Sequence, residues 1–288
     1  MVVVIDNHSS DHSLEGIRGI FPQLYLHKME TNLGYAKANN FAVKVADGCE
    51  WIALLNPDAM PEPDWLENLY RSARENPKFF CFASKQLIAD RPDLLDGAGD
   101  CYHVSGLPWR RGHARSAASL PDVSSEVFSP CGAAAFISRK AFEDAGGFDE
   151  DFFCYIEDVD LGFRMRILGY RCQYVPSAVV HHVGSATTGR QSDFYVYHGQ
   201  RNIVWTFFKN MPMPLLLLYL PHHVALNIFA LIWFSIRGQA KTILRSKWDA
   251  INGLPMVWRK RRNMQSRRKI SAFQLRKAMK RGWPKKRW

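Results

Sequence analysis

Apolar runs with the composition of buried β-strands alternate with helix-patterned segments through the first 75 residues. The runs at 2–5 and 51–55 are uninterrupted and consist mainly of Val, Ile and Leu, and the segments at 35–46 and 63–73 place apolar residues at helical spacing. Chains that alternate in this way form a mostly parallel sheet covered by helices. The pattern predicts an α/β fold and excludes a disordered chain or a fibrous repeat.

Both of these apolar runs end in an acidic loop. Asp6 follows the first run and Asp58 follows the second, and a third acidic segment, Glu157 and Asp158, opens a helix expected over 158–168. Open α/β sheets bind ligands outside the carboxyl ends of their strands. Each acid alone is also explained as a helix cap or a solvated loop residue. Together they favour a site for a cation or a nucleotide.

A histidine pair follows a further apolar run at 178–180. His182 can add a neutral nitrogen ligand to an oxygen-rich site for Mg²⁺ or Mn²⁺. The alternative is a histidine that only makes structural hydrogen bonds. The sequence leaves both interpretations open.

Eight short patterns follow one another in order along the chain. They are Val3-Val4-Ile5-Asp6-Asn7 with Ser10-Asp11, Asn32-Leu33-Gly34-Tyr35 with Asn39-Asn40, Leu55-Asn56-Pro57-Asp58 with Pro63-Asp64-Trp65-Leu66, Gly132-Ala133-Ala134, Gly146-Gly147-Phe148-Asp149, Glu157-Asp158-Val159-Asp160-Leu161-Gly162 with Arg164, His182-Val183-Gly184, and Arg201-Asn202. In this order and spacing they resemble the family 2 glycosyltransferases, in their rhamnosyltransferase-like branch. The resemblance implies the GT-A fold, with a catalytic domain at 1–210 and a hydrophobic helical segment with a basic tail at 211–288.

The resemblance implies an inverting, metal-dependent glycosyltransferase. Such an enzyme moves a sugar from a nucleoside diphosphate to a hydroxyl of a lipid-linked or polysaccharide acceptor in cell-envelope glycan synthesis. The sugar that the resemblance implies is rhamnose. Asp58 is similar to the end of the metal-binding DxD motif and would hold Mg²⁺ or Mn²⁺ together with His182. Asp158 is similar to the base that deprotonates the acceptor, and Glu157 would orient that acceptor.

The resemblance also implies which residues contact the nucleotide sugar: Asp6, Asn7, Asp11, Asn32, Gly34, Asn39, Asp58 and Arg201. Asp6 is similar to the residue that binds the base. Asp11 stays open between a ribose contact and a helix cap, and Arg201 between the diphosphate and a structural ion pair. Asp160 and Arg164 lie four residues apart on one expected helix, so they are expected to pair with each other.

Two features depart from the family pattern. The family's first strand, with its Tyr-Asn loop, has no counterpart before Val3, so the sheet is expected to lack that strand. Either the chain is part of a longer protein, or it is a non-catalytic glycan- or membrane-binding relative of the fold. The metal motif is reduced to Asn56-Pro57-Asp58, which predicts a lower metal affinity.

Positive charge is concentrated after residue 236. Residues 237–288 hold 18 Lys and Arg against one acid, whereas the first 236 residues hold 20 basic and 26 acidic residues. The basic segment follows an apolar run at 213–236 that Pro221 and two histidines interrupt. Its uninterrupted pieces are too short to span a bilayer, and a span would place the basic tail outside. We therefore expect membrane-interacting helices, peripheral or re-entrant, at the cytoplasmic face of the cell membrane.

Tryptophans accompany the basic residues, at Trp248, Trp258, Trp283 and Trp288. Lys, Arg and exposed Trp together favour an anionic membrane surface as partner. The alternative is a buried helical hairpin that leaves a solvated tail. A nucleic-acid-binding tail has a similar composition, but no nucleic acid is expected because the apolar run leads straight into the basic segment. Single cysteines and the lack of a signal peptide indicate a cytosolic compartment.

Overall fold

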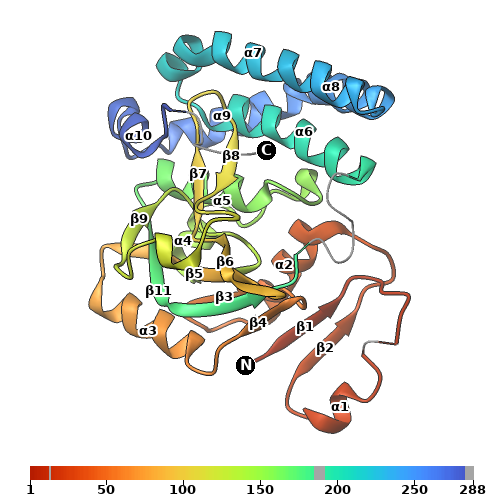
Figure 1. Cartoon of the computed structure of the whole chain (residues 1–288), viewed down its shortest axis with the longest axis vertical. Coiled ribbons are helices and arrows are strands. Elements are labelled where there is room, and N and C mark those ends of the chain that lie inside the picture. The colour runs from red at the N-terminus through yellow and green to blue at the C-terminus, as the bar shows by residue number, and fades with distance from the viewer. Residues whose placement is uncertain (13, 185–191, 283–288) are drawn as a thin grey trace.

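A mixed β-sheet forms the centre of the molecule in the computed structural model, which describes residues 1–12, 14–184 and 192–282 (Figure 1). Seven strands of the described chain belong to it. Its main path is β3 (Trp51–Leu55), β10 (Ala134–Ser138), β5 (Phe79–Ile88), β11 (Arg171–His182) and β4 (Ala59–Pro61), with β6 (Arg91–Gly97) paired to β5 and β9 (Ser125–Val127) paired to β11.

Both faces of this sheet are buried. Ala135 and Ile137 of β10 belong to one hydrophobic core, and Ala134 and Phe136 belong to another. Successive side chains of a strand point to opposite faces, so the two cores lie on opposite sides of the sheet. α5 (Glu157–Ile167) contributes to the first core and α3 (Trp65–Glu75) to the second. The prediction of an α/β fold with helices flanking a sheet is confirmed.

Most strand pairs of this sheet are antiparallel. Among its described pairs only β5 and β11 run parallel, so the expectation of a mostly parallel sheet is wrong in this respect. The alternation of strand and helix that requires parallel pairing ends after α3. β5 instead turns directly into β6 as a hairpin, which can only be antiparallel.

β1 (Val3–Asp6) and β2 (Tyr25–Lys28) form a separate parallel pair. The connection between them contains α1 (Ile17–Ile20), whose four residues are all at least partly exposed. The residue that precedes α1 is Gly16, with a φ of 76°. Asp11 therefore does not cap this helix, which is a single turn.

The remaining elements enclose the sheet. They are α2 (Gly34–Val45), α4 (Arg139–Asp144), the hairpin of β7 (Asp100–Tyr102) and β8 (Pro108–Arg110), and the 3₁₀ turns η1 (Ala117–Ser119) and η2 (Glu150–Phe152). The C-terminal helices α6 (Asp193–Asn210), α7 (Met213–Ile236), α8 (Ala240–Asn252), α9 (Leu254–Ser266) and α10 (Ala272–Ala278) gather at the end of the molecule opposite β1 and β2 (Figure 1).

α7 is one continuous helix that contains Pro221. The expectation that Pro221 divides this segment is wrong: the helix continues past it, although a proline removes one backbone hydrogen bond and crowds the carbonyl four residues earlier. In the described chain α7 is the helix that is long and apolar enough to cross a membrane. Only about a quarter of that stretch, 28%, is buried inside the protein.

The C-terminal helices share a core with the sheet. Met264, Leu275 and Met279 belong to the same cluster as Tyr102 and Phe163. The domain boundary at residue 210 stays a prediction. Trp248 is exposed and Trp258 is partly buried. The predicted Trp283 and Trp288 lie outside the described residues.

Candidate active site

Asp158 lies in the first turn of α5, with its carboxylate held in a fixed direction. Its Oδ2 atom accepts a hydrogen bond from the Gly132 amide at 2.8 Å, and its Oδ1 atom accepts one from the Val159 amide at 2.7 Å. Tyr35 donates to the Gly132 carbonyl at 2.8 Å. A Cβ atom on Gly132 would lie 2.9 Å from the Tyr35 hydroxyl and 3.3 Å from the Asp158 Cβ, so the close approach requires glycine.

Glu157 is the buried neighbour of Asp158. Its side chain is 6% exposed, and its Oε2 atom has no hydrogen-bond partner among the residues that the structure describes. Burial, and then the charge of Asp158, raise the pKa of Glu157 well above its usual range. The pair thus combines the partly exposed carboxylate of Asp158 with the buried carboxyl group of Glu157, which favours its protonated form.

The segment that precedes α5 is strained. Phe153, Tyr155 and Ile156 have φ values of 65°, 64° and 71°, in a region that non-glycine residues seldom adopt. Asn202 of α6 holds this segment. Its amide nitrogen donates to three backbone carbonyls, those of Phe152, Cys154 and Tyr155, at 2.8 to 3.0 Å. Backbone strain of this kind persists only where the surrounding structure enforces it.

Arg201 supports the same segment. Its guanidinium donates to the carbonyls of Asp151 and Phe152 at 3.0 Å and stacks over Trp205 at 4.2 Å. These contacts make Arg201 a part of the scaffold in front of α5. A contact between Arg201 and a diphosphate stays a prediction.

Asp58 and His182 lie side by side at the edge where β11 ends. The Nε2 atom of His182 is 3.4 Å from Asp58 Oδ1, and its Nδ1 atom donates to Asp96 Oδ2 at 2.7 Å. Burial lowers the pKa of His182, but hydrogen bonds to Asp58 and Asp96 outweigh it, so that the pKa is raised. The bond from His182 lowers the pKa of Asp58. Asp96 is buried and fixes the imidazole ring, as the outer carboxylates of metal-binding histidines do.

This donor set fits a divalent cation. It combines the partly exposed carboxylate of Asp58 with an imidazole nitrogen that a buried acid orients. A cluster of three or more His, Cys, Asp or Glu residues suited to a metal is absent from residues 1–12, 14–184 and 192–282. The protein therefore offers two donors, and a bound cation would need oxygen ligands from elsewhere, such as a diphosphate.

Arg110 and Asp100 lie between this cation site and Asp158. Arg110 of β8 contacts Asp96, and its charge also acts on Asp100 and Asp158. Burial raises the pKa of Asp100 well above its usual range, with a further contribution from Asp158. The charge of Arg110 thus acts on both acidic sites.

Sequence reasoning missed Asp96, Asp100 and Arg110. Residues 85–130 have no clear periodicity from which their positions could be inferred. One signal was available: Asp96 and Asp100 flank Gly97-Ala98-Gly99 directly after an apolar pair. Acids enclosed by small and apolar residues are buried only when they are paired.

The expected nucleotide residues gather where β1 ends. Asp6 accepts a hydrogen bond from the Ser9 amide at 2.8 Å, which contributes to lowering its pKa against the effect of burial. Asn7 accepts from the Leu33 amide and donates to Asn32, both at 2.9 Å. Asn32 in turn accepts from the Gly34 amide at 2.9 Å. The structure thus brings Asp6, Asn7 and Asn32 together.

Gly34 connects this group to the strained segment before α5. Its φ is 80°, and a Cβ atom there would lie 2.6 Å from the carbonyl and ring of Phe153. Asn39, further along α2, donates to the Tyr35 carbonyl at 2.9 Å and so supports its own helix. Asp11 is exposed, and its negative charge acts on Asp6, where it opposes the lowering of the Asp6 pKa.

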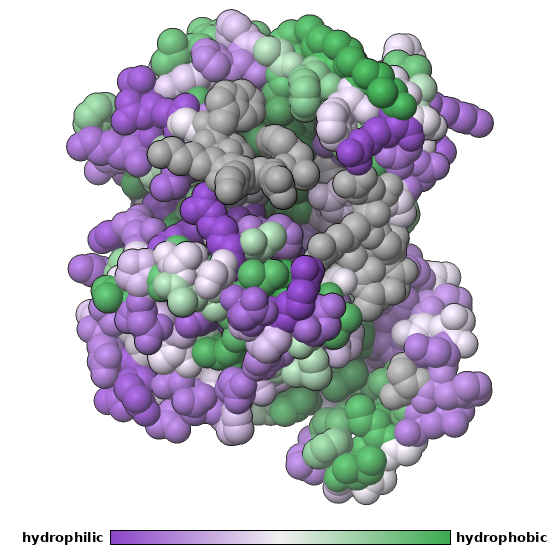
Figure 2. Space-filling view, in the orientation of Figure 1, coloured by the Kyte–Doolittle hydropathy of each residue, from purple (hydrophilic) through white to green (hydrophobic). Residues whose placement is uncertain are grey.

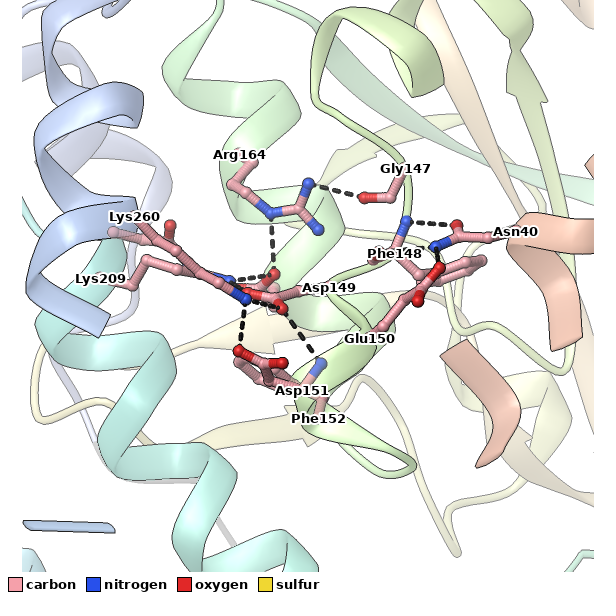
Figure 3. A network of polar contacts seen from close by, with 12 residues as sticks. Asn40, Gly147, Phe148, Asp149, Glu150, Asp151, Phe152, Arg164, Lys209 and Lys260 are labelled. Atoms are coloured by element: carbon pink, nitrogen blue, oxygen red, sulfur yellow. Dashed lines mark hydrogen bonds and ion pairs between the residues drawn. The ribbon is translucent and has the colours of Figure 1, made fainter. Parts of the chain in front are cut away.

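A buried ionic network backs the site from the side of the C-terminal helices (Figure 3). Lys209 contacts Asp149 at 2.5 Å and Asp160 at 2.8 Å, and Lys260 contacts Asp149 at 2.5 Å. Arg164 pairs with Asp160 at 2.8 Å, which confirms that expected pair. The network ties α6 and α9 to the turn that precedes the strained segment.

Comparison with known proteins decides the family. A sequence model described as "Glycosyl transferase family 2" matches residues 1–146, half of the chain. This protein is a family 2 glycosyltransferase. It resembles the N-acetylglucosaminyl-diphospho-decaprenol L-rhamnosyltransferase of Mycobacterium tuberculosis, with 31% identity over 213 residues, 66% of this chain and 68% of that protein. The O-antigen biosynthesis protein RfbC of Myxococcus xanthus is 26% identical over 191 residues, 63% of this chain and 15% of that protein.

Solved structures of this glycosyltransferase fold agree with the family. GalNAc-T7, crystallised with UDP, GalNAc and Mn²⁺, superimposes with a TM-score of 0.58 at 15% identity, over 72% of this chain and 41% of that one. Residues 1–349 of Staphylococcus aureus TarS, in complex with UDP-GlcNAc, superimpose with a TM-score of 0.55 at 16% identity, over 92% and 78%. These similarities confirm the GT-A fold of this glycosyltransferase.

Proposed function

We propose that this glycosyltransferase is an inverting enzyme that moves a sugar from a nucleoside diphosphate to a hydroxyl group of a lipid-linked acceptor. The observation that carries the proposal is the placement of Asp158, whose carboxylate is fixed by the Gly132 amide beside the buried Glu157. A base must be held in one direction to accept a proton during the reaction.

The reaction is a single displacement. Asp158 takes the proton of the acceptor hydroxyl as that oxygen forms a bond to the anomeric carbon. The bond between this carbon and the diphosphate oxygen breaks on the opposite side, and the nucleoside diphosphate leaves with the electron pair. Glu157, in its protonated form, orients the acceptor by donating a hydrogen bond. One displacement inverts the configuration of the sugar.

Asp58 and His182 are the residues that would hold Mg²⁺ or Mn²⁺. A divalent cation bound there supplies charge neutralisation for the leaving diphosphate. Asp96 keeps the His182 ring in place for this role. Asp6, Asn7, Asn32 and Gly34 form the nucleotide side of the site, to which Asp11, Asn39 and Arg201 are assigned by the family resemblance alone.

The printed name of one relative supports a proposal for the donor and the acceptor. The Mycobacterium tuberculosis relative is named for rhamnosyl transfer to a diphospho-decaprenol-linked N-acetylglucosamine. By analogy we assign dTDP-rhamnose as the donor, a lipid-linked saccharide as the acceptor, and the cytoplasmic face of the cell membrane as the place of reaction. The product would enter cell-envelope glycan synthesis.

The test is a transfer assay with the Asp158→Asn variant. The full chain is incubated with dTDP-rhamnose, Mn²⁺ and N-acetylglucosaminyl-diphospho-polyprenol, and the product is identified by mass spectrometry. Loss of the general base should lower the rate at least about 100-fold and leave nucleotide binding unchanged. Glu67→Gln, in the first turn of α3, is the matched control and should keep full activity. Unchanged turnover in Asp158→Asn would remove Asp158 as the base.

A further inference from the structure

α7 presents a wide hydrophobic face to solvent. Its buried residues, among them Tyr219, His223 and Ala230, occupy one side of the helix. Leu217, Val224, Ile228 and Ile232 are exposed and follow one another at intervals of seven, four and four residues, so they share the opposite side. The space-filling view shows hydrophobic residues gathered along the end of the molecule where α7 lies (Figure 2).

α8 extends this face with both apolar and basic side chains. Leu244 and Trp248 are exposed, the latter by 66%. Lys241 and Arg245 lie on the exposed side of the same helix. We name the exposed residues Leu217, Val224, Ile228 and Ile232 of α7, with Leu244 and Trp248 of α8, the α7–α8 face.

The first half of α7 is fixed to the rest of the protein through His223 and Tyr219. The His223 ring donates to the Ser105 carbonyl at 2.8 Å and stacks on Phe207 at 3.9 Å. Tyr219 accepts a hydrogen bond from Arg276 of α10 at 2.8 Å. The helix also packs along α8. To cross a bilayer, α7 would have to break these contacts and carry polar groups of its partners with it.

The charged residues around the α7–α8 face indicate which kind of partner it binds. Between residues 211 and 282 the sequence holds one acid, Asp249, and its carboxylate is engaged by Tyr197 at 2.6 Å. Lys241, Arg245 and Arg237 border the hydrophobic face, and Arg237 lies over Trp233 at 4.3 Å. A hydrophobic face of this size with basic residues and tryptophans at its border matches the interface of an anionic bilayer.

We propose that the α7–α8 face binds an anionic lipid bilayer, with α7 lying in the plane of the membrane rather than across it. The inference deepens the proposed function, since it rests on a lipid-linked acceptor that the enzyme meets at the membrane. It assigns to α7 the role of an interfacial anchor. The catalytic sheet then stays on one side of the bilayer, together with all of the C-terminal helices.

Vesicle binding by the purified full chain tests the proposal. The protein is sedimented with vesicles of phosphatidylcholine alone and with vesicles of equimolar phosphatidylcholine and phosphatidylglycerol. We expect binding to the anionic vesicles that weakens as salt is raised. Replacing two exposed isoleucines of this face, in Ile228→Gln/Ile232→Gln, should lower the partition at least about tenfold.

A matched control separates this face from exposed hydrophobic residues in general. Leu66 and Tyr70 are exposed on α3, at 49% and 46%, and Leu66→Gln/Tyr70→Gln should bind vesicles as the wild type does. Alkaline carbonate should release the protein from vesicles, whereas it would not release a protein held by a membrane-spanning helix. Resistance to carbonate, equal loss in both double variants, or a stable dimer that the Ile228→Gln/Ile232→Gln change disrupts would overturn the proposal.

An assay of sugar transfer distinguishes failure of the membrane proposal from failure of the proposed function. With a short-chain, water-soluble analogue of the lipid-linked acceptor, the Ile228→Gln/Ile232→Gln variant should transfer sugar at the wild-type rate. If the wild type binds anionic vesicles but transfers no sugar, the membrane-binding proposal is supported and the proposed function is wrong. If it transfers sugar but does not bind vesicles, only the membrane-binding proposal is wrong.

Discussion

At the scale of single residues, the site depends on two glycines that permit close contacts. Gly132 lies between Tyr35 and Asp158, and Gly34 lies against Phe153. The Gly132 contact lets its own amide donate to the Asp158 carboxylate, and the Gly34 contact brings α2 against the strained segment that precedes α5. A Cβ atom at either position would displace a neighbouring group. An alanine at either position should therefore lower activity more than the loss of a surface charge does.

Gly132→Ala should reduce catalysis through Asp158. The new Cβ atom would lie 2.9 Å from the Tyr35 hydroxyl, so either this ring or the Asp158 carboxylate must move. We expect kcat to fall about 100-fold, as for a displaced base, with nucleotide binding retained. Tyr35→Phe removes the hydroxyl and should restore part of the activity in the double variant. If the double variant is no faster than Gly132→Ala, the contact with Tyr35 is not the cause.

At the scale of elements, the local pattern of the sequence was sufficient where strands and helices alternate. The strand over 51–55 and the helices expected over 35–46 and 158–168 agree with β3, α2 and α5 within one residue. The prediction failed where the pairing between strands, rather than a periodic pattern of apolar residues, decides the structure. The hairpin of β7 and β8 and the edge strand β6 have no periodicity of their own, because their register comes from the neighbours with which they pair.

The candidate site was predictable to the same extent. Asp58, Asp158 and His182 follow strands or open a helix, so the position of each could be inferred. Asp96, Arg110 and Tyr35 could not be placed, since their roles arise from contacts across the fold. Their burial depends on partners that no local pattern specifies.

The anchoring of α7 should make stability depend on pH. Burial, partly offset by the hydrogen bond to Ser105, lowers the pKa of His223 from 6.5 to about 4. Above pH 6.5 the ring is neutral in both the folded and unfolded chains. As the pH falls from 6.5 towards 4, only the unfolded chain takes up the proton, so stability decreases, by about 2 kcal/mol at pH 5.

Urea unfolding at pH 7.5 and pH 5 measures this effect. His223→Gln removes the titrating group, so the variant should lose about 2 kcal/mol less than the wild type over the same interval. The comparison cancels the contribution of the other histidines. An equal loss in both proteins would show that His223 does not couple α7 to pH.

At the scale of the whole molecule, the C-terminal helices and the catalytic sheet are joined by buried charge as well as by a shared core. Lys209 and Lys260 meet at Asp149, whose pKa is lowered by these two lysines against the effect of its burial. The turn at Asp149 leads into the segment that places Asp158. The network therefore fixes the C-terminal helices to the segment that precedes the base.

Lys209→Met should strongly destabilise the protein. Lys209 is 2% exposed, and its loss leaves Asp149 and Asp160 without one of their buried partners. Breaking a buried ion pair in this way costs about 3 to 5 kcal/mol. Lys140→Met, which breaks an exposed pair with Asp144, should cost no more than about 1 kcal/mol. Equal denaturation midpoints for the two variants would argue against the network.

The measurement that tests the account most directly is nucleotide binding by the full chain. Thermal unfolding is followed with a set of nucleoside diphosphates and nucleotide sugars, with and without Mn²⁺, for the wild type, Asp58→Asn and the control Asp93→Asn. Asp93 is exposed on the same strand as Asp96. We predict stabilisation by one nucleotide that requires Mn²⁺, is lost in Asp58→Asn and is kept in Asp93→Asn. The absence of stabilisation by any nucleotide would contradict the account and would favour a non-catalytic relative of the fold.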